Sequence, residues 1–93
     1  NINVLHFNTI LKQIGCNDKI AIDIRFGPLF SKNRNIYYLD FERNYIGNFD
    51  YAIFEYDVEN KNEIYQNYYK KLLNNNKYKF LFNQNNVFIL SNR

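Results

Sequence analysis

The sequence has few of the residues on which catalytic and metal sites most often depend. Its 93 residues include one cysteine and one histidine, and neither tryptophan nor methionine. A lone Cys16 excludes an intrachain disulfide and a cysteine metal cluster, so we interpret it as a structural thiol. His6 lacks the second histidine of an HxxxH or HExxH pattern and is interpreted as an ordinary polar helix residue. We therefore predict no catalytic residue, no metal and no cofactor in this chain.

Long apolar runs and a strong charge are also missing. No stretch approaches the roughly 18–20 apolar residues that span a bilayer. The net charge of +3 is too weak to indicate a nucleic acid partner. The length fits a single soluble domain over residues 1–93. The chain has no initiator methionine and no signal-peptide pattern, from which we expect a piece cut from a longer protein or a processed product.

Apolar residues are abundant in short runs, of which residues 19–24 form the first predicted strand. Ile20, Ala21, Ile22 and Ile24 are interrupted there only by Asp23, and β-branched side chains favour a strand. Gly27 and Pro28 are expected to end this strand, because glycine opens positive φ and proline lacks a donor. A helical turn at residues 29–30 and a second strand at 36–40 complete the unit of a parallel sheet.

Helical spacing appears twice. Phe7, Ile10, Leu11 and Ile14 lie on one face of a predicted helix over residues 2–14, with Gly15 as a left-handed C-cap. A third strand at 51–56 precedes a second helix, for which Asp57 or Asn60 is the expected N-cap. The apolar stripe of that helix comprises Ile64, Tyr65, Tyr68, Tyr69, Leu72 and Leu73, while Lys70 and Lys71 are expected in water.

The last part of the chain predicts a hairpin. Alternating residues at 78–82 and an apolar run at 87–90 flank the segment 83–86, which contains no glycine. Asparagine must therefore supply any position with positive φ. The element order indicates an α/β fold, a small two-layer or three-layer Rossmann-like domain with a mostly parallel sheet. We predict the strand order 2-1-3, with the first strand central, and a C-terminal antiparallel hairpin.

The end of the first strand is the best candidate for a ligand site, since open α/β sheets bind ligands beyond the carboxyl ends of their strands. Arg25 and Gly27 lie at this rim, and Lys32 and Arg34 follow closely in the sequence. Guanidinium groups and turn amides favour phosphate, so these four residues form an anion-site hypothesis. The alternative is a plain tight turn with solvated charges.

Carboxylates also lie at or near predicted strand ends, and two that face each other could act in acid–base chemistry. They are Asp23, Asp40, Glu42, Asp50, Glu55 and Asp57. The sequence does not bring any pair of them together. Solvated or capping carboxylates are the alternative interpretation.

The segment GPLFSKNRNIYY (Gly27 to Tyr38) resembles the "phLsnRrniY" segment in the C-terminal soluble region of a family of predicted multi-spanning membrane proteins of unknown function, related to the GT-C type glycosyltransferases. The segments before and after it stand in the same order as in the family. IAID resembles the family's "VaaD" strand, and Asp50 to Ile53 its "DYvvv". Residues 68–73 resemble "yy..LL", 78–82 "Yklvf", and 87–93 the closing "gvvvfkR". The chain departs from the family at Leu29, where histidine is common, and in the final hairpin, which lacks the usual glycine.

The resemblance implies a non-catalytic extracytoplasmic accessory or recognition domain of a membrane glycosyltransferase-like protein, at the extracytoplasmic face of the cell membrane. Its implied partners are the preceding transmembrane helices of the full-length protein and a lipid-linked or cell-surface glycan. The catalytic acid of GT-C enzymes lies between early membrane helices, so it corresponds to no residue here. The full-length protein could still be a membrane glycosyltransferase. The alternative is a free-standing α/β module that binds a phosphate-containing ligand or a protein partner.

Overall fold

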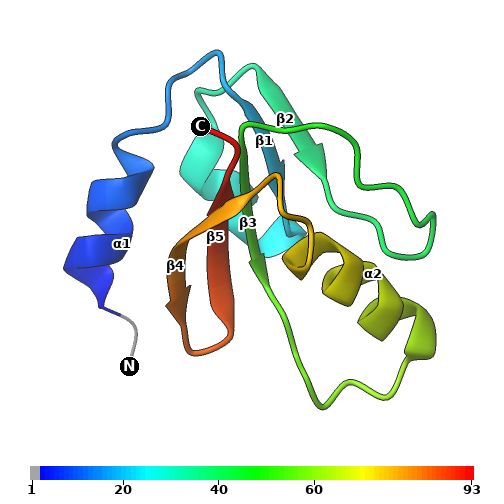
Figure 1. The fold of residues 1–93 in the computed structure, drawn as a ribbon. Helices are drawn as coiled ribbons and strands as arrows, with labels where there is room; N and C mark the ends of the chain where they lie inside the picture. Colours follow the sequence, from blue (N-terminus) through cyan, green and yellow to red (C-terminus); the bar gives the residue numbers. More distant parts are fainter. Residues whose placement is uncertain (1–2) are drawn as a thin grey trace.

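The order of the strands explains where the rest of the chain lies. The computed structural model describes residues 3–93, in which the strands are β1 (Lys19–Ile22), β2 (Asn35–Tyr38), β3 (Tyr51–Glu55), β4 (Lys79–Gln84) and β5 (Val87–Ser91). Their order is β2-β1-β3-β5-β4 (Figure 1). β1 pairs in parallel with β2 and β3, whereas β5 pairs antiparallel with β3 and β4. The predicted 2-1-3 order and C-terminal hairpin are confirmed, but the sheet is mixed rather than mostly parallel.

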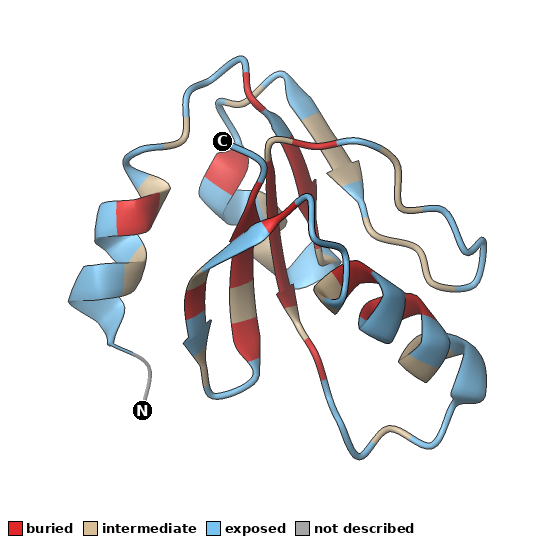
Figure 2. Ribbon diagram, viewed as in Figure 1, coloured by how far each residue is buried: buried red, intermediate tan, exposed pale blue. Residues whose placement is uncertain are grey.

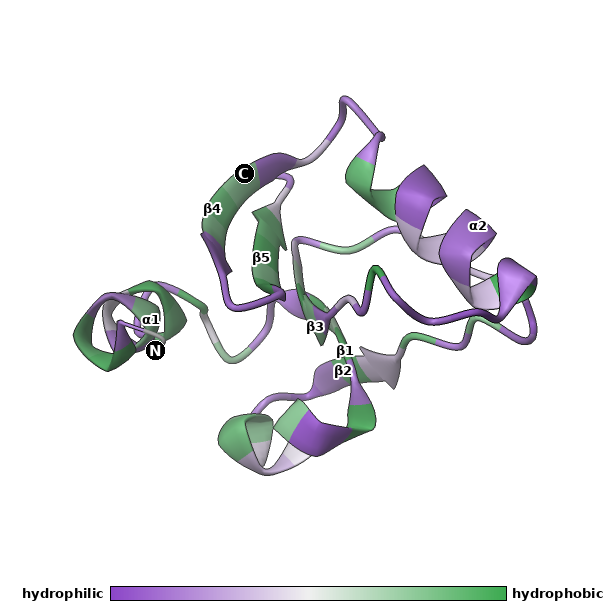
Figure 3. Ribbon diagram, turned by 90° about the horizontal axis from the view of Figure 1, so that it is seen from below, coloured by the Kyte–Doolittle hydropathy of each residue, from purple (hydrophilic) through white to green (hydrophobic). Residues whose placement is uncertain are grey.

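Helical segments cover both faces of this sheet. The helix α2 (Glu63–Leu73) packs on one face, and α1 (Val4–Leu11) and the 3-10 helix η1 (Ile24–Phe30) pack on the other (Figure 3). The domain therefore has three layers. The connection from β2 to β3 contains no helix within the described chain, so the fold is α/β without being clearly Rossmann-like. None of the helices in residues 3–93 is long and apolar enough to cross a membrane.

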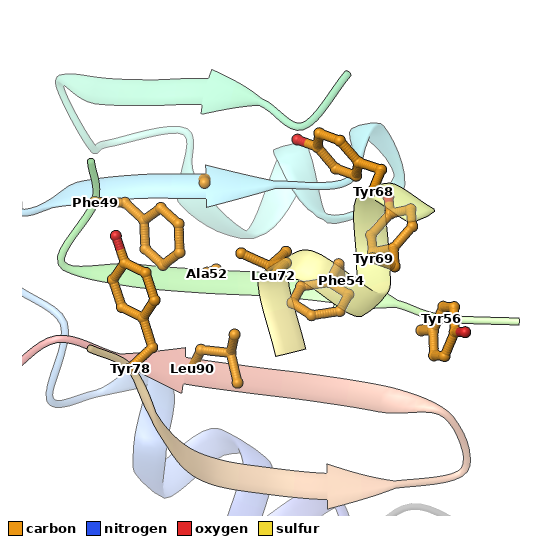
Figure 4. Packing of buried hydrophobic residues seen from close by; sticks show 10 residues of the cluster. Phe49, Ala52, Phe54, Tyr56, Tyr68, Tyr69, Leu72, Tyr78 and Leu90 are labelled. Atoms are coloured by element: carbon orange, nitrogen blue, oxygen red, sulfur yellow. The ribbon is translucent and has the colours of Figure 1, made fainter. Parts of the chain in front are cut away.

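Side-chain alternation along the strands divides the core in two. Ile20, Ile22 and Ile53 pack with α1 and η1, whereas Ala21 and Ala52 face α2. Buried residues follow β1, β3 and β5, while the edge strand β2 has none (Figure 2). On the α2 side the core is largely aromatic (Figure 4). Aromatic rings bury a large area per residue, which suits a chain too short for a thick aliphatic core.

The first helix is shorter than predicted. It begins after the N-cap Asn3, whose side chain accepts a hydrogen bond from the His6 amide at 3.0 Å, and it ends at Leu11. Gly15 does not form the predicted left-handed cap. Instead its amide donates to Asp18 Oδ2 at 2.7 Å, which turns the chain into β1. The predicted residues 1–2 of this region lie outside the described residues.

The second helix begins at a different cap from those predicted. Asn62 accepts hydrogen bonds from the amides of Ile64 and Tyr65 at 2.9 and 3.2 Å. Asp57 and Asn60 instead close tight turns before the helix, because each side chain accepts from the amide two residues further on.

Most of the predicted α2 stripe is confirmed. Tyr68, Tyr69 and Leu72 are buried, and Tyr65 and Leu73 pack against them. Lys70 and Lys71 are exposed, as predicted. Ile64 is the exception, because this first-turn residue is 56% exposed.

The crossover after β1 also differs from the prediction. The strand ends at Ile22 rather than at residue 24, and Gly27 and Pro28 lie within η1 instead of separating a strand from a helical turn. The cause is a change of direction at Asp23. Its amide donates to Ile53 in β3, and its carbonyl accepts from Phe26 at 3.0 Å, which begins the 3-10 helix. Ile24 is consequently exposed.

The hairpin between β4 and β5 confirms the role expected of asparagine. Asn85 and Asn86 have φ values of 50° and 66° and form the two-residue connection. Two consecutive left-handed residues match the twist of the flanking strands. Residues 83 and 84 continue β4 rather than belonging to the turn.

Candidate functional site

The connections of the parallel strands diverge at the carboxyl ends of β1 and β3. η1 carries the chain from β1 to β2 along one face. β3 continues through residues 56–62 into α2, which packs on the opposite face. The segment 39–50, which leads from the carboxyl end of β2 to the amino end of β3, lies on that face too, where Phe41, Ile46 and Phe49 pack in the α2 cluster. Such a divergence opens a crevice at the strand ends, which is where α/β sheets bind ligands. A groove of about 1300 Å³ begins here and continues along β2.

Asp23 is the central polar residue at this end of the groove. Its Oδ2 accepts a hydrogen bond from the Glu55 amide at 2.7 Å, and its Oδ1 accepts from the Tyr69 hydroxyl at 3.1 Å. The carboxylate thus joins the ends of β1 and β3 to α2. Burial raises the pKa of Asp23 above its usual value, although these hydrogen bonds and the nearby Arg25 oppose the shift.

Two further contacts close this end of the groove. Arg25 forms an ion pair with Glu55, so its charge is already partly neutralised. The Tyr65 hydroxyl accepts a hydrogen bond from the Asp57 amide at 2.8 Å, which fixes the start of the segment that leads to α2. Burial also raises the pKa values of Tyr65 and Tyr69 above the usual tyrosine value.

The wall opposite is the segment 40–48, which tyrosine hydroxyls hold in place. Tyr37 donates to the carbonyl of Asn48 at 2.7 Å, and Tyr68 donates to the carbonyl of Tyr45 at 2.8 Å. Asp40 and Tyr45 also form an isolated antiparallel bridge. Burial raises the pKa of Tyr68 to about 12, so this hydroxyl remains a donor at neutral pH. These contacts fix the path of the segment 40–48, which has no helix or strand of its own.

Two tyrosines of the groove leave their rings largely in solvent. Tyr38 is 54% exposed and Tyr45 is 65% exposed. Each lies against a glycine, because a Cβ added to Gly27 would come within 3.1 Å of the Tyr38 hydroxyl, and one added to Gly47 within 2.9 Å of the Tyr45 hydroxyl. Gly47 also has a φ of 72°, which glycine adopts readily. The glycines therefore make room for two exposed rings that line the groove from opposite sides of β2, Tyr38 on the η1 side and Tyr45 on the side of the segment 40–48.

The four residues of the anion-site hypothesis do not gather at one rim. Arg25 and Arg34 both line the groove, but Arg25 follows the carboxyl end of β1, whereas Arg34 precedes β2, whose first residue pairs with Lys19 at the amino end of β1. Gly27 lies behind Tyr38, and Lys32 does not line the groove. The cause is the crossover, which returns the chain from the carboxyl end of β1 to the amino end of β2 before Arg34 is reached.

Most of the carboxylates at the predicted strand ends line the groove. Four of the six line the groove, namely Asp23, Asp40, Glu55 and Asp57, whereas Glu42 and Asp50 do not. No three His, Cys, Asp or Glu side chains in residues 3–93 converge as metal ligands. His6 stacks on Phe82 with ring centroids 5.6 Å apart, and Cys16 is exposed in the turn before β1. Neither of these residues lines the groove.

Sequence reasoning missed the tyrosines of the site. Tyr38 stands in a predicted strand and Tyr45 in a segment that reads as polar. The available signal was an aromatic residue beside a lone glycine in a polar segment, as in Tyr45-Ile46-Gly47. Comparison of this chain with protein-family models, with curated proteins and with solved structures finds no match.

Proposed function

We propose that this chain is a non-catalytic recognition domain that binds carbohydrate in the groove along β2. The observation that carries the proposal is the pair of exposed rings, Tyr38 and Tyr45, each backed by a glycine and lining one groove with four carboxylates. A sugar ring has a C–H face that packs on an aromatic ring and a rim of hydroxyls that donate to carboxylates and amides. The groove offers both kinds of contact.

The scaffold supports a site of this kind. In the proposal, the β2-β1-β3 half serves as a Rossmann-like unit, with its ligand at the point where the strand connections diverge. The groove is long and runs beside β2. This shape suits an extended ligand better than a small compact one.

The state of the carboxylates favours binding over catalysis. Asp23 accepts hydrogen bonds at both oxygens, and Glu55 is paired with Arg25. Asp40 accepts from two amides of its own turn and pairs with Arg43 at 3.3 Å. These contacts hold each carboxylate as an acceptor with lone pairs left for sugar hydroxyls, whereas a general acid or base must also exchange a proton with its substrate. We therefore expect neither glycosyl transfer nor hydrolysis of a lipid-linked sugar by the purified domain.

The wider role follows from the family resemblance. We propose that the domain acts at the extracytoplasmic face of a membrane glycosyltransferase-like protein, beside the preceding transmembrane helices, where it recognises a lipid-linked or cell-surface glycan. The alternative, a free-standing module that binds a phosphate-containing ligand or a protein partner, draws less support at the rim predicted for it, because Arg25 is paired and Lys32 does not line the groove.

The test is a titration of the isotope-labelled domain with neutral oligosaccharides, followed by amide chemical shifts. We expect shifts confined to β2, the segment 40–48 and the carboxyl ends of β1 and β3. Tyr38→Ala and Tyr45→Ala should each weaken binding about fivefold to tenfold, the loss of one aromatic contact of roughly 1 kcal/mol. Phe80→Ala is the matched control, since Phe80 is 51% exposed on β4 and does not line the groove.

Several results would contradict the proposal. One is a flat response to every neutral sugar tested, and another is equal weakening by Phe80→Ala. Binding of a nucleotide at the same tyrosines without binding of sugars would reassign the groove to base stacking. Turnover of a lipid-linked sugar by the domain would contradict the non-catalytic role.

A further inference from the structure

The four cations that line the groove are not equivalent. Arg25 is paired with Glu55, and Arg43 is paired with Asp40. The side chains of Lys19 and Arg34 have no ion-pair partner among residues 3–93. Both line the groove and both residues are exposed. Two cations therefore remain available to a ligand.

The backbone places these two residues at the same end of the groove. Lys19 is the first residue of β1, and it pairs with Asn35, the residue after Arg34. The Arg34 amide donates to the carbonyl of Cys16 at 3.2 Å, and the Lys19 amide donates to Asp50 Oδ2 at 2.9 Å. Both side chains thus start from fixed backbone positions at the amino end of the parallel strands.

The carboxylates at this end are already engaged. Asp18 Oδ1 lies 2.6 Å from an Arg93 guanidinium nitrogen, and Asp50 Oδ2 lies 3.6 Å from the same nitrogen. Neither carboxylate lines the groove. The other end of the groove carries Asp23, Glu55 and Asp57. The groove is consequently polarised along β2, with free cations at one end and carboxylates at the other.

We infer that the ligand of this groove is an acidic sugar, whose phosphate or carboxylate group is held by Lys19 and Arg34 while its neutral part lies toward Tyr38 and Tyr45. The inference rests on the proposed carbohydrate binding and names its ligand class. Arg34 can contact two oxygens of such an anion with its planar guanidinium, and Lys19 adds a compact charge with three donors. The carboxylates at the far end would repel a second anion, which sets the direction of the ligand.

The experiment compares glucose, glucose 6-phosphate, glucuronic acid and inorganic phosphate as probes of the intact chain. We expect the two anionic sugars to bind about threefold to tenfold more tightly than glucose, the range for one or two exposed charge pairs. The gain should shrink as sodium chloride is raised, since exposed charges are screened. The phosphate and carboxylate probes distinguish the two possible anions, and either one showing the gain supports the inference.

A double variant, Lys19→Gln with Arg34→Gln, should bring the ratio of anionic-sugar affinity to glucose affinity down to about one. Lys32→Gln with Arg43→Gln is the matched control, because it removes the same charge from a residue outside the groove and from a cation already paired. Thermal unfolding of each variant checks that it is folded.

The outcomes separate the inference from the proposed function. Equal binding of glucose and the anionic sugars would overturn the inference and leave carbohydrate binding intact. Inorganic phosphate that binds as tightly as glucose 6-phosphate would overturn it too, since the sugar would contribute nothing. Absence of binding by all three sugars would overturn the inference together with the carbohydrate proposal.

Discussion

Asp23 stabilises and destabilises the fold at the same time. Its two hydrogen bonds join β1 to β3 and to α2, but its charge is partly buried. Because burial raises its pKa, the folded chain binds the proton of Asp23 more tightly than the unfolded chain does. The contribution of Asp23 to stability is therefore greatest below the ordinary carboxyl pKa, and it is lost as the pH rises through the raised pKa.

Asp23→Asn should remove this pH dependence without removing the contacts. The amide oxygen can accept from the Glu55 amide, and the amide nitrogen can donate to the Tyr69 hydroxyl. In urea unfolding between pH 4 and 8, we expect the variant to gain stability over the natural chain as the pH rises and to equal or exceed it at pH 7. Parallel pH profiles of the two chains would refute this. Asp23→Ala is the control, and it should cost about 1–3 kcal/mol by leaving the Glu55 amide unpaired.

Among the elements, α2 depends most clearly on one face. Leu72 is fully buried in the aromatic cluster, whereas Lys71 is exposed and makes one long contact, 3.4 Å from its Nζ to Asn44 Oδ1. Leu72→Ala should lower the unfolding free energy by about 2–5 kcal/mol, because it removes buried methyl groups and leaves a cavity. Lys71→Ala should cost less than about 0.5 kcal/mol. Chemical denaturation measures both, and similar losses would mean that the buried face of α2 is wrongly assigned.

The sequence predicts the strands better than the segments between them. Apolar runs identify β1, β3 and β5, because strands that are buried on both faces have nearly continuous apolar sequences. The predicted N-cap of α2 is wrong. Asp57, Asn60 and Asn62 are all residue types that favour an N-cap, and only the path of the chain selects Asn62. The sequence also did not predict the β-bulge between Phe80 and Phe82 in β4. The bulge allows Phe80 to pair with Leu90 and Phe82 with Ile89, on opposite faces, where strict alternation would place both on one face.

The same limit explains what was missed at the site. The sequence locates Asp23 and Arg25 at the end of a strand, and both do line the groove. It does not reveal that the crossover carries Arg34 to the amino ends of the strands. Nor does it reveal that Asp23 accepts a hydrogen bond from Tyr69, a residue 46 positions away. Tyr38 and Tyr45 become neighbours of one groove only after the segment 40–48 is fixed by Tyr37 and Tyr68. Contacts between distant residues define this site, and local patterns do not encode them.

At the scale of the whole molecule, the position of β5 makes the fold dependent on the last strand of the described chain. β5 lies between β3 and β4, and Ile89 and Leu90 are fully buried. A chain that stops at Asn86 should show no cooperative unfolding, because β3 loses one of its two neighbours and β4 loses its only pairing among the described residues. A chain that stops at Ser91 loses the ion pair between Arg93 and Asp18. It should remain folded at a cost of about 1–3 kcal/mol.

Thermal unfolding followed by circular dichroism distinguishes the two shortened chains. A sharp transition in the chain that stops at Asn86 would show that the parallel half β2-β1-β3 is stable by itself.

The interior place of β5 also has a consequence for synthesis on the ribosome. Until Ser91 has emerged, β3 presents an apolar strand edge whose backbone groups will later pair with β5. Strand edges of this kind readily recruit the strands of other chains. The sheet therefore cannot be completed progressively, and the folding of this domain must wait until β5 is available. We expect ribosome-bound intermediates to need a holding chaperone, and products of premature termination to be insoluble rather than partly active.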